Sequence, residues 1–124
     1  MTDVITLQLP PDGDFFGVAH LVLGGLAARL ELTYDVLDDM TTAIDELLQA
    51  RDSTDDLVLS VEIENDALVA TVGPFTRRVV DDLRLRDEEL CLRRVLDAAV
   101  DDVELSERQG SHWVELTKSI AGGD

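Results

Sequence analysis

The chain has 124 residues, which suits one domain; we expect that domain over residues 1–120 and a mobile tail over residues 121–124. Its hydrophobic fraction of 45% argues against disorder, and an aromatic fraction of 4% leaves Leu, Val, Ile and Ala to build the core. A formal net charge of −17 argues against direct binding to nucleic acid or anionic membranes and favours a partner protein with a basic face. The same acidity would also serve solubility alone.

Several local features favour the cytoplasm. The longest apolar stretch, residues 18–28, is too short to span a bilayer, and the first ten residues lack the basic region and apolar run of a secretion signal. Cys91 is the only cysteine, so no internal disulfide can form and a Cys/His zinc site is not expected. We interpret His20 as a packed core residue, His112 as a surface residue and Cys91 as a small buried side chain.

The first two elements are expected to be a strand and an unusually apolar helix. Residues 4–9 alternate polar and apolar side chains, which predicts a strand with one apolar face that ends at Pro10-Pro11. Residues 15–30 predict a helix that is apolar almost all round, which indicates burial on more than one side. The second side would be either a subunit interface or a contact with a neighbouring helix and the sheet. Three glycines would let another backbone come close: Gly17, Gly24 and Gly25.

A second helix is expected over residues 34–51, with Thr33 as its N-cap. Apolar side chains recur on one face at helical spacing, and carboxylates recur on the opposite face. The five carboxylates are Asp35, Asp38, Asp39, Asp45 and Glu46. Few basic residues lie within one turn of them, so the face is self-repelling. Most faces of this kind are merely solvated, but this one is also a candidate surface for a protein partner.

The second half of the chain predicts a hairpin, a helix and two more strands. The hairpin strands are residues 57–63 and 67–72, and Gly73-Pro74 is expected to end the second of them. Residues 75–87 have no clear period and give no assignment. The remaining expected elements are a helix over 88–100 and strands over 103–105 and 112–120. This order predicts an α+β fold, a two-layer sandwich with helices on one face of a mixed, mostly antiparallel sheet.

Two segments carry a resemblance to a known family. They are GLAARLELTYDVLDDMTTAIDEL, residues 25–47, and VLDAAVDDVEL, residues 95–105, which a last strand follows. Both resemble bacterial anti-sigma regulatory factors, the serine-protein-kinase branch of the histidine-kinase-like (GHKL) ATPase superfamily. The resemblance extends over nearly the whole chain. It implies the histidine-kinase-like fold, a partner that is a sigma factor or an anti-sigma-factor antagonist, and a homodimer.

The chain departs from the family pattern at three places that serve nucleotide binding. In the family a Glu is followed four residues later by an Asn that holds magnesium, but here Glu46 is followed by Ala50, whose methyl group cannot ligate a hard cation. The family's Asp-x-Gly-x-Gly after the hairpin is replaced by residues 73–76, Gly-Pro-Phe-Thr. The late glycine box is replaced by residues 86–92, which contain no glycine and three consecutive carboxylates.

These departures lead us to expect no bound ATP, no magnesium or other metal and no catalytic residue. Glu46 stands at the position of the family's catalytic base and is interpreted as a relic, because without a bound triphosphate a base has nothing to act on. We therefore expect a regulator that sequesters a partner protein in transcription control. The alternatives are a divergent but active ATP-dependent serine-protein kinase and a dimerisation module.

A basic segment is the second candidate surface for the partner. Residues 1–76 contain two basic and fifteen acidic residues, whereas six of the ten basic residues of the chain lie between residues 77 and 94. The candidates there are Arg77, Arg78, Arg84 and Arg86. These arginines could equally pair internally with the acidic helix, which would leave neither surface free for a partner.

Overall fold

The computed structural model describes residues 4–84 and 92–120. Its strands are β1 (Val4–Leu9), β2 (Leu57–Glu64), β3 (Ala67–Phe75), β4 (Asp102–Arg108) and β5 (Ser111–Ser119). Its helices are α1 (Phe16–Arg29), which a short 3-10 turn over Gly13–Phe15 precedes, α2 (Tyr34–Ala50), α3 (Arg77–Arg84) and α4 (Leu92–Ala99). None of the helices in these described ranges has both the length and the apolarity needed to cross a bilayer.

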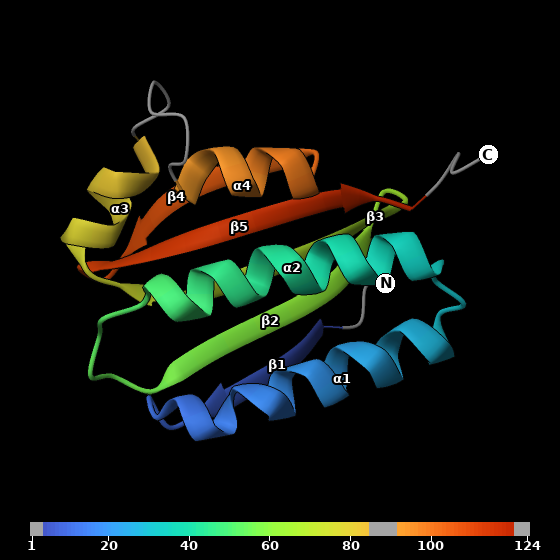
Figure 1. The fold of residues 1–124 in the computed structure, drawn as a ribbon, viewed down its shortest axis with the longest axis horizontal. Coiled ribbons are helices and arrows are strands. Elements are labelled where there is room, and N and C mark those ends of the chain that lie inside the picture. The colour runs from blue at the N-terminus through green and yellow to red at the C-terminus, as the bar shows by residue number, and fades with distance from the viewer. Residues whose placement is uncertain (1–3, 85–91, 121–124) are drawn as a thin grey trace.

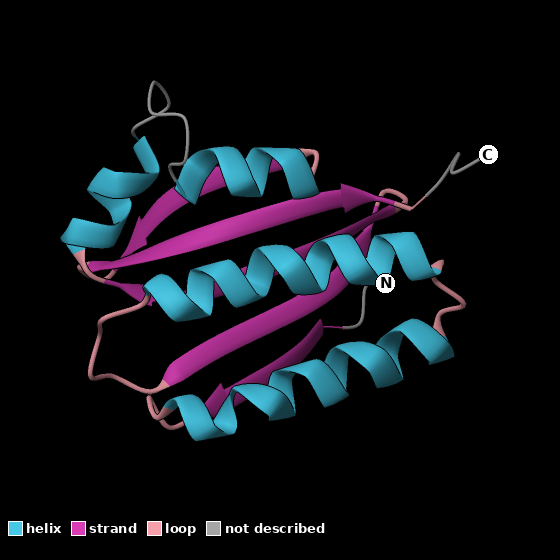
Figure 2. Cartoon of the chain, in the orientation of Figure 1, coloured by secondary structure: helices cyan, strands magenta, loops and turns pink. Residues whose placement is uncertain are grey.

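The strands form one sheet in the order β1-β2-β3-β5-β4, and the helices lie together on one of its faces (Figures 1 and 2). The predicted α+β sandwich is therefore confirmed. All four strand pairs are antiparallel, which corrects the expectation of a mixed sheet. The open face of the sheet, on the side away from the helices, is not covered by any described helix.

The core lies between the sheet and the helices, and it follows the two sequence periods. Alternate residues of the central strands are buried on the helix side. They include Leu57, Leu59, Val61, Leu68, Ala70, Val72, Val114 and Leu116. The apolar stripe of α2 packs against them, with Met40, Ile44 and Leu47 fully buried. Because α2 lies along the middle of the helix layer, its opposite face points to solvent (Figure 1).

The turns and caps follow the sequence at two points. The Thr33 hydroxyl accepts a hydrogen bond from the backbone N–H of Val36 at 3.3 Å, so it caps α2 as predicted. The hairpin between β2 and β3 turns at Asn65 and Asp66, whose φ angles are 52° and 60°. Positive φ at both central residues matches the twist of the flanking strands, and Asn and Asp tolerate it better than most residues.

The predicted end of the second hairpin strand is wrong. β3 continues through Gly73 and a cis Pro74 to Phe75, and its register against β5 shifts between Val72 and Phe75. An irregularity of this kind accommodates a proline, because the backbone N–H that proline lacks is not needed where the ladder is interrupted. The strand therefore leads directly into α3, which lies within residues 75–87, where no element was predicted.

Other boundaries differ by a few residues. β4 is longer than the predicted strand over 103–105 and runs to Arg108, before a turn at Gln109-Gly110. The predicted helix over 88–100 is observed as α4, Leu92–Ala99, and its first residues fall outside the described part of the chain. Cys91 and the expected tail over residues 121–124 also lie outside the described residues.

The apolar helix α1 is buried on one side only. Ala19, Leu23 and Ala27 pack into the core, whereas Leu21 on the opposite side is 76% exposed. α1 thus contacts the core and the neighbouring helix α2, as one of the two alternatives expected, while the side that carries Leu21 stays open within one copy of the chain. His20 is not a core residue: its exposed ring forms an ion pair with Asp45 of α2.

Candidate functional site

The acidic face of α2 points to solvent, and two of its five carboxylates have partners from other elements. Asp39 pairs with Lys118 of β5 at 3.0 Å, and Asp45 pairs with His20 of α1. Asp35 and Asp38 are exposed and, like the partly buried Glu46, form no ion pair with a described residue. The repulsion between carboxylates that the sequence predicted is thus reduced at Asp39 and Asp45, which have cationic or histidine partners. It remains at Asp35 and Asp38.

The three described arginines of α3 form ion pairs with carboxylates that do not belong to this acidic face. Arg77 and Arg84 flank Asp81 within the same helix, at 4.0 and 3.8 Å, and Arg78 pairs with Asp52 at 2.9 Å. For these three arginines the alternative of internal pairing with the acidic helix is wrong. Arg86, the fourth candidate, lies outside the described residues. Partner binding by these residues and by the carboxylates of α2 stays a prediction.

Arg93, within the same basic segment, is buried and structural. Its guanidinium donates to Asp97 at 3.1 Å and to the backbone carbonyls of Leu83 and Val103 at 3.3 and 3.2 Å. It therefore joins α3, α4 and β4 and supplies no charge to the surface. Sequence reasoning placed it in an exposed segment because a charged residue on a short helix gives no local sign of burial.

Arg51, the residue after Ala50, ties the end of α2 to the segment that replaces the family's Asp-x-Gly-x-Gly motif. Its Nε donates to the carbonyl of Pro74 at 2.9 Å, and one Nη donates to the carbonyls of Asp55 and Asp56 at 2.6 and 3.0 Å. Burial lowers the pKa of this guanidinium, while the carboxyls of Asp55 and Asp56 act against that shift. The loop after α2 is thus fixed against the end of β3.

Asp52 makes a second connection between the same segments. Its carboxylate accepts from the Thr76 hydroxyl at 2.5 Å and from Arg78 at 2.9 Å. The hydrogen bond from Thr76, and next the one from Arg78, hold the pKa of Asp52 below its ordinary value of 3.8. The stability that this contact contributes is therefore present above that ordinary value and is lost as the pH falls through the lowered pKa.

Every residue of the segment that replaces the Asp-x-Gly-x-Gly motif has an internal role. A Cβ on Gly73 would lie 2.5 Å from the ring of Trp113, so glycine is required for that packing. Pro74 gives its carbonyl to Arg51, and Phe75 is 3% exposed in the core. Thr76 is bound to Asp52. The segment offers no carboxylate for an adenine amino group, and Ala50 offers no oxygen for a cation, so these residues do not fit a nucleotide with its magnesium.

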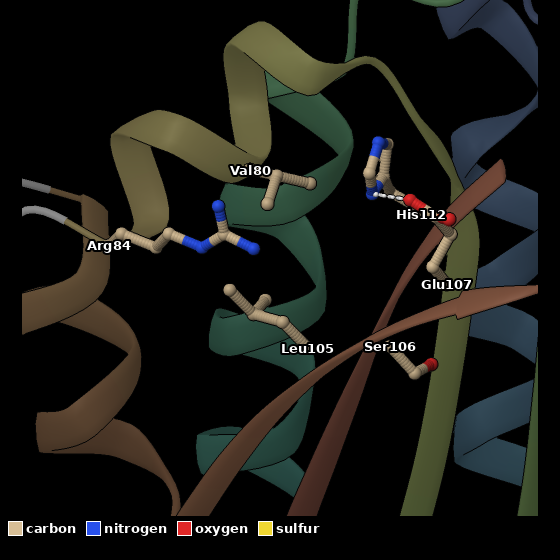
Figure 3. A pocket seen from close by; sticks show the side chains of 6 residues that line it. All are labelled: Val80, Arg84, Leu105, Ser106, Glu107 and His112. Atoms are coloured by element: carbon tan, nitrogen blue, oxygen red, sulfur yellow. Dashed lines mark ion pairs between the residues drawn. The ribbon is translucent and has the colours of Figure 1, made fainter. Parts of the chain in front are cut away.

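A small pocket lies between α3 and the end of the β4–β5 hairpin (Figure 3). Val80, Arg84, Leu105, Ser106, Glu107 and His112 line its volume of about 230 Å³. That volume is below the roughly 300–1,000 Å³ of most small-molecule sites. His112 Nδ1 lies 3.7 Å from the carboxylate of Glu107, and its side chain is only 21% exposed, so it is less exposed than the sequence predicted.

The pocket shows no arrangement for catalysis. Ser106 points away from the His112–Glu107 pair (Figure 3), so no nucleophile is held against a base. Within residues 4–84 and 92–120, no group of three or more His, Cys, Asp or Glu side chains is placed to hold a metal ion. Sequence reasoning missed this pocket because its walls come from three separate elements, one of which had no assignment.

Comparison with known proteins supports the resemblance in the sequence. No family model matches the chain. Serine-protein kinase RsbW of Bacillus velezensis is 34% identical over 44 residues, 36% of this chain and 28% of that protein. Serine-protein kinase RsbW of Listeria monocytogenes serotype 4a is 35% identical over 48 residues, 39% of this chain and 31% of that protein. The aligned stretch therefore spans less than a third of the length of these relatives.

A solved structure extends the likeness to nearly the whole fold. The crystal structure of the RsbU and RsbW domains of Rv1364c from Mycobacterium tuberculosis matches 95% of this chain and 32% of that chain, with a TM-score of 0.69 and 12% identity. An identity that low shows the shared fold alone. The predicted resemblance is confirmed at this level: the chain is similar to serine-protein kinases RsbW in part of its sequence and shares its fold with this structure.

Proposed function

We propose that this chain is a protein-binding regulator of the anti-sigma type that sequesters a partner protein in the cytoplasm and does not bind ATP. The observation that carries this proposal is the internal use of the nucleotide-motif region. Arg51 and Asp52 tie the loop after α2 to Pro74 and Thr76, and these contacts take the place of a nucleotide cradle. A protein that has the fold of these kinases but binds no ATP would act through its surface, by binding another protein.

The acidic face of α2 is the surface that best fits a partner. Asp35 and Asp38 are exposed and have no described cation beside them, so a basic partner surface would relieve their mutual repulsion. The partner proposed from the family resemblance is a sigma factor or an anti-sigma-factor antagonist. A DNA-binding protein such as a sigma factor would bring the basic surface that this face requires.

An active serine-protein kinase is the second candidate, because the relatives with 34–35% identity are named as such. It would need a nucleotide cradle made from residues other than those of the family pattern. The two proposals differ in what they require of ATP. Partner capture that is equal with and without Mg-ATP supports the regulator, whereas capture that depends on ATP, or transfer of phosphate to the partner, supports the kinase.

The direct test is a pull-down with the purified chain as bait and a panel of purified sigma factors and antagonist proteins from the same organism as prey. We expect one prey to be retained at low salt and released as the salt concentration rises, because the contact is between opposite charges. Absence of retention across both classes of prey would contradict the proposal. An unrelated acidic protein of similar size, used as bait in place of the chain, is the control for non-specific binding and should not retain that prey.

A further inference from the structure

The pocket between α3 and the β4–β5 hairpin has charged groups on two opposite sides and apolar side chains between them (Figure 3). Arg84 reaches into it from the end of α3, and the pair formed by Glu107 and His112 lies on the other side. Val80 and Leu105 line the space between the charged groups. A ligand that fills this pocket therefore needs one group for each charge and an apolar part that separates the two groups.

The guanidinium of Arg84 has hydrogen-bonding capacity to spare. Its only ion-pair partner among the described residues is Asp81, and the distance of 3.8 Å from Nη1 to Oδ1 is too long for a hydrogen bond. By contrast, the guanidinium of Arg78 lies 2.9 Å from the carboxylate of Asp52. A guanidinium can bind a carboxylate through two parallel hydrogen bonds, so a ligand carboxylate is the complementary group on this side of the pocket.

The carboxylate of Glu107 has spare capacity on the other side. It lies 3.7 Å from His112 Nδ1, which is also too long for a hydrogen bond, and it pairs with no other cation of the described residues. The histidine is charged only when it is protonated. An ammonium group would give this carboxylate a charge-assisted hydrogen bond, which a neutral histidine does not supply. A ligand ammonium group is therefore the complementary group on this side.

The net charge of the chain and the size of the pocket narrow the ligand further. At −17 the chain repels free anions, and it attracts free cations to many acidic sites besides this one. A zwitterion avoids both effects, because its charges cancel at a distance while each is matched inside the pocket. The volume of about 230 Å³ corresponds to on the order of seven or eight water molecules, so the zwitterion must be short.

We propose that this pocket binds a short ω-amino acid, a zwitterion whose carboxylate and ammonium group are separated by a few methylene groups. The carboxylate lies against the guanidinium of Arg84, and the ammonium group lies against the carboxylate of Glu107. The methylene groups between them contact Val80 and Leu105. An α-amino acid carries both charges on the same carbon atom, so it does not reach the two sides of the pocket at once.

Titration of the isotope-labelled full chain, followed by its amide chemical shifts, tests the ligand class. The probes are β-alanine, γ-aminobutyrate and δ-aminovalerate, and we expect at least one of them to cause saturable shifts in α3, β4 and β5. Glycine, and the alkyl carboxylate and alkylamine of the same length as the best probe, should each bind at least about tenfold more weakly, because each loses one charge-assisted hydrogen bond. The absence of saturable shifts with all three probes would overturn the proposal.

Substitutions in the pocket test the two contacts. Arg84→Gln and Glu107→Gln should each weaken binding of the best probe by at least about tenfold. These side chains are 63% and 65% exposed, so both variants should keep the circular dichroism spectrum of the fold. The matched controls are Arg77→Gln, since Arg77 pairs with the same Asp81, and Glu104→Gln on the same strand as Glu107. Neither control residue lines the pocket, so neither substitution should change the affinity.

Three further outcomes would overturn the proposal. An alkyl carboxylate that binds as tightly as the best probe would make the pocket a site for anions, and an alkylamine that does so would show general attraction of cations to an acidic chain. Equal weakening by the pocket variants and their matched controls would assign the effect to net charge. These titrations use the chain without a partner protein, so their outcome is independent of whether it captures a transcription partner.

Discussion

At the scale of single residues, Gly73 shows how packing against one neighbouring side chain can explain a glycine at a motif position. A glycine in the nucleotide region suggests contact with phosphate, but this glycine makes room for the ring of Trp113 on the open face of the sheet. We expect Gly73→Ala to reduce the free energy of unfolding by about 1–3 kcal/mol, the usual range for overpacking. Chemical denaturation monitored by circular dichroism measures it.

The control for that variant is the same substitution in a protein that lacks the indole ring of Trp113. In the background of Trp113→Ala, where the ring no longer occupies the space, Gly73→Ala should have little further effect. The two substitutions should therefore be strongly coupled in a double-mutant cycle. Additive effects would show that the alanine is not opposed by the ring.

Ala50 gives a second prediction for a single residue. Restoring the family's asparagine with Ala50→Asn should not produce ATP binding, because Arg51 and Asp52 still tie the loop to Pro74 and Thr76. Isothermal titration of the variant with Mg-ATP at millimolar concentration measures this. A clear binding signal from that single substitution would mean that these internal contacts do not prevent ATP binding.

Residue-level prediction from sequence succeeded where the cause is local. Thr33 was predicted as an N-cap because the cap acts over three residues, and it makes that hydrogen bond. His20 was assigned wrongly, since its partner Asp45 is 25 positions away on another helix. The packing of Trp113 over Gly73 also joins distant segments, and the sequence contains no local sign of it.

At the scale of elements, the open face of the sheet concentrates negative charge. Glu115 of β5 lies directly opposite Glu104 of β4. Burial raises the pKa of Glu115, and the carboxylate of Glu104 raises it further. A raised pKa in the folded state means that this group opposes folding once it is ionised, so the stability falls as pH rises above its ordinary value of 4.5.

Glu115→Gln should therefore stabilise the protein at pH 7, by about 0.2–1 kcal/mol for a like-charged cross-strand pair. The gain should shrink toward pH 4, where the carboxyl is protonated in the folded state. Thermal unfolding of both proteins at the two pH values checks this, with Glu31→Gln, away from the sheet, as the matched control. An equal gain at both pH values would contradict the electrostatic cause.

The elements themselves were largely predictable because each has one buried face. Period-two alternation in β2, β3 and β5 and the helical stripe of α2 gave elements that the structure confirms. α3 was missed because its eight residues are too few to show a helical period among so many charges. The continuation of β3 through Pro74 was missed because the bulge that accommodates it depends on β5.

At the scale of the whole molecule, the acidic face of α2 should govern partner binding. Asp35→Lys with Asp38→Lys should weaken capture of the partner and reduce its dependence on salt, with the fold unchanged. Asp39 is left in place because it pairs with Lys118. Affinity measured at several salt concentrations checks this prediction.

The matched control is the pair Glu62→Lys and Glu64→Lys on β2, which changes the net charge equally at a distance from α2. It should change the affinity much less than the α2 pair does. If both pairs weaken binding alike, the net charge and not this surface attracts the partner. If neither does, the interface lies elsewhere on the molecule.

The whole fold was the most predictable level, because the family resemblance and the order of elements agreed. The candidate site was the least predictable, since it depends on contacts that join the loop after α2 to the end of β3 and the start of α3. The missing magnesium ligand at Ala50 is visible in the sequence, whereas the hydrogen bonds of Arg51 to Pro74 and of Thr76 to Asp52 join distant residues and follow from no local pattern.

The most direct measurement is isothermal titration of the purified chain with Mg-ATP at millimolar concentration, with a serine-protein kinase RsbW as the positive control. Arg51 and Asp52 hold the loop after α2 to Pro74 and Thr76, and Ala50 offers no magnesium ligand, so we predict no heat of binding and no shift of the melting temperature. Saturable binding of ATP would contradict the account and make the kinase the leading function.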